Sequence, residues 1–180
     1  MNRVFLRAIS TEDLEFIYKW HSDSNLYKTV MGPYRFTSID AEREWLQNKT
    51  KYNNKEMNLM ICLSENSLPI GFLSVREIDW ISRKGKLAGV IIGEAEHQSQ
   101  GYGTDAVKLV LKHFFEDLGL NRMWGFLLHD NLPSLRMLEK CGFQVEGHLK
   151  QHAFKNGQFR DVLLIGLCSD QYFEKKQLIN

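Results

Sequence analysis

The spacing of hydrophobic residues in the first third of the 180-residue chain predicts one strand followed by two helices. Val4 to Ile9 is an apolar run typical of a first strand. Ser10 to Asp13 follows with a hydroxyl cap and early acidic residues, the pattern with which helices begin. Gly32-Pro33 then interrupts the chain, and a second helix is expected from about Ser38 to Thr50. In the first helix, one face is expected to be formed by Leu14, Ile17, Tyr18 and His21.

From Met57 the hydrophobic period changes to that of strands. Three short apolar runs, at about 58–63, 70–78 and 85–93, are separated by polar turns and predict an antiparallel meander. Helical spacing then returns and continues to Gly119, where the helix is expected to end. The buried stripe of this helix is predicted to be Ala106, Leu109, Val110, His113 and Phe114.

The remaining third alternates strand and helix. We expect a strand from Met123 to Leu128, a helix from Asn131 to Lys140, strands at about 143–154 and 159–168, and a short terminal helix within 169–180. This element order predicts an α/β (α+β) layer arrangement, a mixed sheet with helices on its faces. A length of 180 residues suits one domain spanning 1–180.

Composition narrows the possible functions. Lysine and arginine total 23 against 22 acidic residues, so no overall basic field favours nucleic acid or an anionic membrane as a partner. Three widely spaced cysteines fit neither a disulfide framework nor a metal-ligand motif, and no metal site is predicted. No basic-then-apolar leader or membrane-spanning run is present, so we expect a cytoplasmic protein.

A glycine-bearing turn is the most informative local motif. Gln98 to Thr104 follows an apolar strand and opens a helix, so its free backbone N–H groups can cradle a phosphate. Gly101 and Gly103 let the backbone approach an anion closely. The same glycines can simply make a tight connection. Ala106 in place of a third glycine disfavours a dinucleotide fold, and no Gly-Lys-Ser/Thr follows to form a Walker P-loop.

A second motif gives the turn its context. Asn131-Leu132-Pro133-Ser134 and Glu139-Lys140-Cys141-Gly142-Phe143 follow the glycine turn by some thirty residues or more. Together with Leu6-Arg7 and the segments 146–149 and 156–161, they make the chain resemble the GNAT superfamily of N-acetyltransferases. The similarity is to its RimJ/RimL-like branch of ribosomal-protein N-terminal acetyltransferases and to the neighbouring spermidine acetyltransferases.

The resemblance implies a single GNAT-like domain with a twisted, mostly antiparallel sheet of about seven strands. Two central strands would splay apart, and acetyl-CoA would lie in the V between them. The strand edge at Val90 to Gly93 would bind the pantetheine arm, and the glycine turn would bind the pyrophosphate. The implied cofactor-binding residues are Ile91, Ile92, Gly93, Gln98, Ser99, Gln100, Gly101, Tyr102, Gly103, Thr104, Asn131, Ser134, Arg136 and Lys140. A helix cap for Asn131 and a solvated surface position for Lys140 are the simpler alternatives.

Catalysis requires a proton donor for the departing thiolate and a base for the amine. Many members of the superfamily carry a tyrosine seven residues after the motif asparagine, but this chain has Leu138 there. The resemblance then makes Ser134 the candidate acid. Glu94, at the end of the strand before the turn, is the first candidate base, with Glu77 and Asp79 as others that can act through water. Each acid can equally be an exposed surface residue.

The acceptor pocket is expected between the N-terminal helices and the strand ends. Trp20, Tyr34 and Glu77 are the candidate substrate-binding residues, although aromatic residues at such spacings are more often core. The leading hypothesis is acetyl transfer from acetyl-CoA to a primary amine, either a protein N-terminus or a small molecule such as a polyamine. A CoA-binding sensor or interaction module with little activity is the alternative, and the resemblance makes a homodimer possible.

Overall fold

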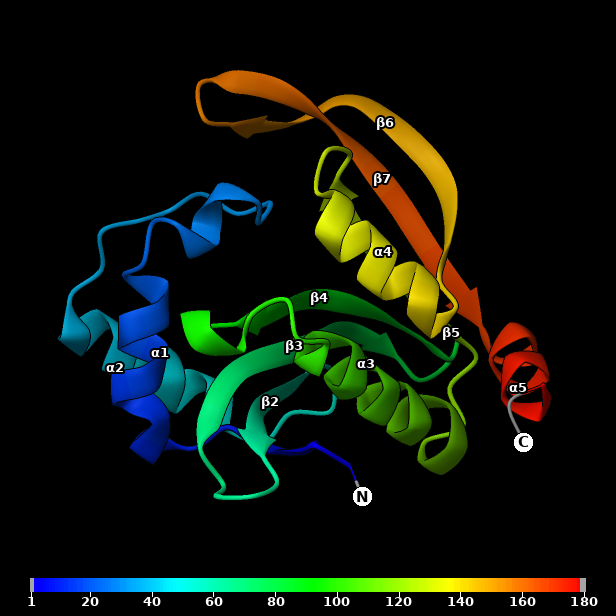
Figure 1. The fold of residues 1–180 in the computed structure, drawn as a ribbon, viewed down its shortest axis with the longest axis horizontal. Helices are drawn as coiled ribbons and strands as arrows, with labels where there is room; N and C mark the ends of the chain where they lie inside the picture. Colours follow the sequence, from blue (N-terminus) through cyan, green and yellow to red (C-terminus); the bar gives the residue numbers. More distant parts are fainter. Residues whose placement is uncertain (1, 179–180) are drawn as a thin grey trace.

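Residues 2–178 are described by a computed structural model, in which one seven-stranded sheet carries helices on both faces (Figure 1). The strands are β1 (Val4–Ala8), β2 (Met57–Leu63), β3 (Pro69–Asp79), β4 (Lys84–Ile92), β5 (Arg122–Leu128), β6 (Gln144–Lys155) and β7 (Gln158–Cys168). The α-helices are α1 (Leu14–His21), α2 (Ile39–Thr50), α3 (Tyr102–Lys112), α4 (Leu132–Cys141) and α5 (Ser169–Gln177). The predicted element order is confirmed, and positions 179 and 180 of the expected terminal helix lie outside the described residues.

The sheet is mixed and mostly antiparallel, as predicted. Its strand order is β1-β2-β3-β4-β5-β7-β6, and β4 and β5 are the neighbouring strands that run parallel. Their pairing consists of Lys84 with Arg122, Gly85 with Met123 and Lys86 with Trp124. Beyond Lys86 the two strands are not paired, so the sheet opens at its centre.

Two hydrophobic clusters fix the helices against the two faces of the sheet. The larger joins the central strands to α3 and α4 and includes Val75, Val110 and Leu138. The smaller joins β2 to α1 and α2 through Met60 and Trp20. Each fully buried large apolar side chain contributes about 1.5–3 kcal/mol to folding. The two clusters therefore hold the helices firmly against the sheet.

The helices turn slightly different faces inward than the sequence suggested. In α1 the buried residues are Ile17 and Trp20, while Tyr18 and His21 are only half-buried. Of the predicted stripe, Ala106, Val110 and Phe114 are buried and Leu109 is half-buried, whereas His113 is exposed and pairs with Asp117 at 2.8 Å. Val107 and Leu111 of α3 are buried as well. The buried face of the helix is therefore turned away from His113.

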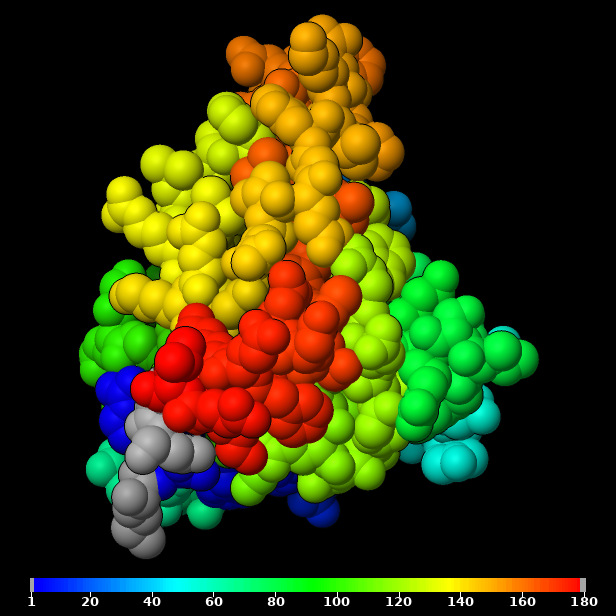
Figure 2. Space-filling model, turned by 90° about the vertical axis from the view of Figure 1, so that its right-hand side faces the viewer, coloured from blue at the N-terminus to red at the C-terminus, as the bar shows by residue number. Residues whose placement is uncertain are grey.

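A loop segment reaches across from the α1 side to the β5 side of the opening. Lys155, at the end of β6, donates a 2.6 Å hydrogen bond to the Gly32 carbonyl, and Asn131 Nδ2 donates one of 2.9 Å to the Thr29 carbonyl. Burial lowers the pKa of the Lys155 ammonium group. Figure 1 shows the β6–β7 hairpin arching toward this segment (residues 29–32, hereafter the bridging segment). In Figure 2 the β6–β7 hairpin, in orange, projects above α5, in red.

The helices of residues 2–178 include none with the length and apolar character that crossing a bilayer requires.

The start of α1 is tied to β1 by an ion pair. Arg7 of β1 donates hydrogen bonds of 2.8 and 2.6 Å to the buried carboxylate of Asp13, which also accepts the Ser10 N–H at 2.8 Å. Burial alone would raise the pKa of Asp13, but the hydrogen bonds from Arg7 and Ser10 outweigh it and hold the pKa below its ordinary value. The charged form of Asp13 therefore stabilises the fold.

We expect Asp13→Asn to lower the free energy of unfolding by about 2 kcal/mol at neutral pH, because the Arg7 cation loses its partner. The folded-state pKa is depressed, so this contribution is complete above the ordinary pKa of 3.8 and disappears as the pH falls through the lower folded value. Denaturant titrations at several pH values measure the difference. Glu12→Gln, at the exposed neighbouring acid, is the matched control, and an equal loss from both variants would contradict the assignment.

Candidate active site

The opening between β4 and β5 contains a cleft of about 290 Å³. Leu87 to Ile91 of β4 form one wall, and Phe126 and Leu127 of β5 form the other. Residues of α4 line it as well, and the bridging segment contributes Thr29 to Gly32. The prediction that two neighbouring strands splay apart is confirmed, and α3 and α4 lie side by side at this opening (Figure 1).

An extra residue bends β4 where it borders the cleft. Ser74 of β3 pairs with Gly89, whereas the next residue, Val75, pairs with Leu87. Ala88 is therefore left without a partner, which is a β-bulge, and bulges bend a strand and increase its twist. From this bulge onward β4 pairs with β3 alone, so its other backbone edge faces the cleft without a strand partner.

The turn before α3 presents free N–H groups, as a phosphate cradle requires. Gly101 is the N-cap in a left-handed conformation with φ of 87°, and its carbonyl accepts the Asp105 N–H at 3.1 Å. The N–H groups of residues 102–104 consequently have no acceptor within the helix, and they carry the positive end of its dipole. Gln98 Nε2 donates a 3.0 Å hydrogen bond to the Ile92 carbonyl, which fastens the turn to the end of β4.

Arg3 belongs to this turn and was missed from the sequence. Its Nη1 donates a 3.0 Å hydrogen bond to the Gln100 carbonyl, its Nε donates one of 2.8 Å to Asp105, and its guanidinium lies 4.8 Å from the centre of the Tyr102 ring. It therefore fastens the turn to the start of β1 and forms an ion pair with Asp105, with 2.7 Å between its Nη2 and the carboxylate. A lone arginine ahead of the first strand carries no signal that it will meet a turn about a hundred residues later.

Of the three cofactor residues predicted at the end of β4, one lines the cleft and two do not. Ile91 lines the cleft. Ile92 and Gly93 are absent from its lining, and the Gly93 N–H donates a 2.8 Å bond to Ile70 of β3. A Cβ at position 93 would meet the Trp20 indole at 2.4 Å, so this glycine allows α1 to pack closely. Its structural role is therefore explained without a cofactor.

Helix α4 directs two of the predicted polar residues into the cleft. Asn131 caps the helix by accepting the Ser134 N–H at 3.2 Å, and both residues line the cleft with Leu138. The cap and a role toward a ligand are compatible, because the Asn131 amide has other polar atoms. Leu138 is 6% exposed, so an apolar side chain occupies the position of the missing tyrosine.

The outer part of α4 faces a second cavity. Arg136 is exposed and lies outside both cavity linings. Lys140 lines a basic cavity of about 670 Å³ between α3, α4 and α5, together with Arg3 and Lys108. Gly103 and Thr104 lie where α4 packs against α3: a Cβ on Gly103 would meet the Met137 sulfur at 2.9 Å, and the Cys141 thiol approaches the Thr104 carbonyl at 3.7 Å.

Glu94, the first candidate for the base, is engaged elsewhere. Its carboxylate accepts hydrogen bonds of 2.9 and 2.7 Å from Lys19 and one of 2.9 Å from Trp20 Nε1. Burial raises the pKa of Glu94, but these hydrogen bonds outweigh the effect and lower it, which makes the carboxylate a weak proton acceptor. Glu94 is also outside the cleft lining, so the structure makes it a tether between α1 and the end of β4.

Two of the three predicted substrate-binding residues lie outside the cleft. Trp20 is 1% exposed and packs in the smaller hydrophobic cluster, 6.1 Å from the Phe72 ring, so it is a core residue and not part of the cleft wall. Tyr34 donates a 3.2 Å hydrogen bond to the Ser22 carbonyl within the α1–α2 loop. Whether Trp20 is buried depends on how α1 is rotated about its axis, and the spacing of residues in the sequence does not determine that rotation.

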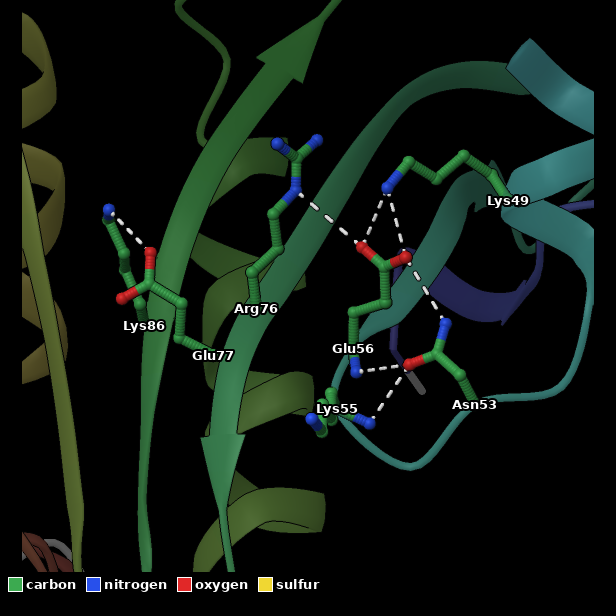
Figure 3. Close-up of polar contacts among 7 residues, drawn as sticks. All are labelled: Lys49, Asn53, Lys55, Glu56, Arg76, Glu77 and Lys86. Atoms are coloured by element: carbon green, nitrogen blue, oxygen red, sulfur yellow. Dashed lines mark hydrogen bonds and ion pairs between the residues drawn. The ribbon is translucent and has the colours of Figure 1, made fainter.

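Glu77, the third, does line the cleft, beside Arg76 and Lys86. Figure 3 shows the Glu77 carboxylate directed at the Lys86 ammonium group, and the two are 2.9 Å apart. Arg76 turns the other way, toward Glu56, with 3.9 Å between its Nε and the nearer carboxylate oxygen (Figure 3). These three residues are the ionisable groups among the described residues that line the cleft.

A sheet that splits between two strands, with an anion-binding turn at one end of the split, defines a protein that holds an extended ligand bearing phosphates. A family model for the acetyltransferase (GNAT) domain matches residues 3–144. The chain belongs to this family, and it is accordingly an N-acetyltransferase that uses acetyl-CoA.

Individual relatives agree over almost the whole chain. Spermidine N(1)-acetyltransferase of Vibrio cholerae is 29% identical over 98% of this chain and 99% of its own length. A crystal structure of the Vibrio cholerae spermidine N-acetyltransferase with CoA and spermine has a TM-score of 0.86, is 28% identical, and covers 96% of this chain and 99% of its own. The probable N-acetyltransferase YjcK of Bacillus subtilis is 32% identical over 92% of this chain and 94% of its own. Membership of the ribosomal-protein branch is not supported by these similarities.

We expect Gly101→Trp to raise the Kd for CoA about tenfold or more while the chain stays folded, because the indole and the strained φ disturb the N–H cradle. Isothermal titration with CoA measures the affinity. Gly157→Trp is the matched control, since Gly157 has a comparable φ of 77° and lies in an exposed turn with nothing within 4 Å of its would-be Cβ. Unchanged CoA affinity in the Gly101 variant would remove the turn from the cofactor site.

Proposed function

We propose that this chain transfers the acetyl group of acetyl-CoA to a small primary amine bound in the β4–β5 cleft, by direct attack of the amine on the thioester. The observation that carries the proposal is the unpaired edge of β4 facing β5 across the cleft. An amide-bearing arm such as pantetheine can pair with this edge as an added strand would. Its thioester would then lie between the two strands.

The remaining cofactor contacts follow from this placement. The N–H groups of residues 102–104 would hold the pyrophosphate, with Arg3 fastening the turn through Gln100 and Asp105. Gln98 would keep this turn in place, and Asn131 and Ser134 would meet the pantetheine arm where they line the cleft. Lys140 would act through its charge from the adjoining basic cavity.

Ser134 is the proposed donor of the proton that the CoA thiolate takes up. Its hydroxyl is at the cleft, and its backbone is fixed by the Asn131 cap. Leu138 has no proton to supply, so a mechanism through the usual tyrosine is not open to this chain. Glu77 is the proposed base that takes the proton from the amine through a water molecule. Among the described residues, it is the one that brings a carboxylate to the cleft lining. Backbone N–H groups of β4 would stabilise the oxyanion.

The acceptor is proposed to be a small molecule. The relatives named above include enzymes of spermidine, and one is solved with spermine, which supports a free amine in preference to the protein N-terminus that the ribosomal-protein branch would use.

The proposal is tested by measuring thioester consumption over a panel of primary amines, with acetyl-CoA binding measured in parallel by titration. We expect saturable turnover with at least one amine. Tight binding of acetyl-CoA with no amine-dependent CoA release across the panel would instead support a sensor or interaction module.

We expect Ser134→Ala to lower kcat about a hundredfold while the Kd for acetyl-CoA stays within about threefold, because general acid catalysis contributes factors of this size. Steady-state kinetics with the best amine and binding titration give the two values. Ser64→Ala, at an exposed turn serine, controls for loss of a hydroxyl as such. Equal kcat values for wild type and the Ser134 variant would dismiss the hydroxyl as the acid.

A further inference from the structure

A second bulge places two oppositely charged neighbours in the same cleft. Arg76 pairs with Lys86 and Asp79 pairs with Lys84, so Glu77 and the residue after it stand opposite a single residue of β4. Glu77 has a φ of 53°, a left-handed conformation that is uncommon for glutamate and marks the bulge. In a regular strand residues 76 and 77 would point to opposite faces, but here both line the cleft.

Arg76 is a cation whose hydrogen-bonding capacity is not used. Its nearest acid is Glu56 at 3.9 Å, and that carboxylate is already bound by Lys49 at 2.8 and 2.9 Å and by Asn53 at 3.2 Å (Figure 3). Burial raises the pKa of Glu56, but those partners lower it overall. Within residues 2–178 no hydrogen bond reaches the two terminal nitrogens of Arg76, whose side chain is 44% exposed.

Lys86, by contrast, is compensated on two sides. Its ammonium group is 2.9 Å from Glu77 and lies over the rings of Trp124 and Phe126 at 5.1 and 5.4 Å. The cleft therefore holds two cations and one acid, and the acid is already paired. A polyamine would bring further ammonium groups to a lining that already holds two cations and one paired acid.

We infer that the acceptor is an amine that also carries a carboxylate, with the Arg76 guanidinium binding the carboxylate and the amine directed toward the β4 edge. This rests on the proposed function. A planar guanidinium with two free terminal nitrogens matches a carboxylate in a bidentate geometry. The rest of the lining is largely apolar, including Met31, Phe126 and Ile165, so the body of the acceptor is apolar, as in an amino acid with a hydrocarbon side chain.

The spacing along the strand suits such a molecule. Arg76 lies two residues beyond Ser74, which pairs with Gly89 at the β4 bulge, so the Arg76 backbone is about 7 Å along the strand from that bulge. An amine at the β4 edge and a carboxylate at Arg76 can therefore belong to one compact molecule. Glu77, which also lines the cleft, stays paired with Lys86 and so keeps that cation from competing with Arg76 for the carboxylate.

Matched acceptor pairs test the inference by thioester consumption: leucine against leucinamide, 5-aminopentanoate against pentylamine, and spermidine as the polycation. We expect kcat/KM for the carboxylate member of at least one pair to exceed that of its partner about tenfold or more. Leucinamide has the less basic amine, so at neutral pH a larger fraction of it is unprotonated and able to attack. Amine basicity would therefore favour leucinamide, and a preference for leucine must have another cause.

Arg76→Gln should abolish this preference by raising KM for the carboxylate amine about ten- to a hundredfold, read out as the ratio of kcat/KM values within each pair. Glu56 keeps Lys49 and Asn53, so the fold should tolerate the change. Arg43→Gln, at an exposed arginine of α2, is the matched control.

A preference for spermidine, equal use of both members of every pair, or a preference that survives Arg76→Gln would each overturn the inference while leaving acetyl transfer to a small amine intact. Absence of turnover with every amine, despite acetyl-CoA binding, would instead remove the proposed function itself.

Discussion

Everything at the site depends on how early β4 and β5 stop pairing. Three residue pairs join these parallel strands, and the bulge at Ala88 then turns β4 away while its pairing to β3 continues. An unpaired strand edge normally invites aggregation. Here the edge is enclosed by α4 and the bridging segment, so it is available to a ligand rather than to another chain. The hydrophobic clusters on both faces keep the two halves of the sheet in place around the opening.

Charge is distributed unevenly around this opening. At the glycine turn the helix dipole favours an anion, while Arg3 is paired with Asp105. On the other side, Glu77 is paired with Lys86 at 2.9 Å, and Arg76 has only a long ion pair of 3.9 Å with Glu56. Glu94, which the sequence suggested as a base, instead holds α1 to the end of β4. The carboxylates near the site therefore serve mostly to position cations.

The sequence was most informative where local chemistry determines structure. Ser38, Gly101 and Asn131 cap the helices that they were expected to begin, because a cap depends on residues within one turn. Contacts between segments distant in the chain could not be predicted from the sequence. The rotation of α1 that buries Trp20 is set by packing against β3, and the meeting of Arg3 with Gln100 is set by sheet order. The bulge at Glu77 has no glycine to announce it, so adjacent residues facing one cleft were not predicted.

The two hydrogen bonds from the bridging segment have a mechanical consequence. Asn131 to Thr29 and Lys155 to Gly32 connect the α1 side of the molecule to elements on the β5 side, across the mouth of the cleft. Separating the two sides at this segment would break both bonds. Asn131 also accepts the Ser134 N–H at the start of α4, so one amide side chain holds both this helix and the bridging segment in place. A change at residues 29–32 would therefore be felt at the start of α4, although the two are about a hundred residues apart in the chain.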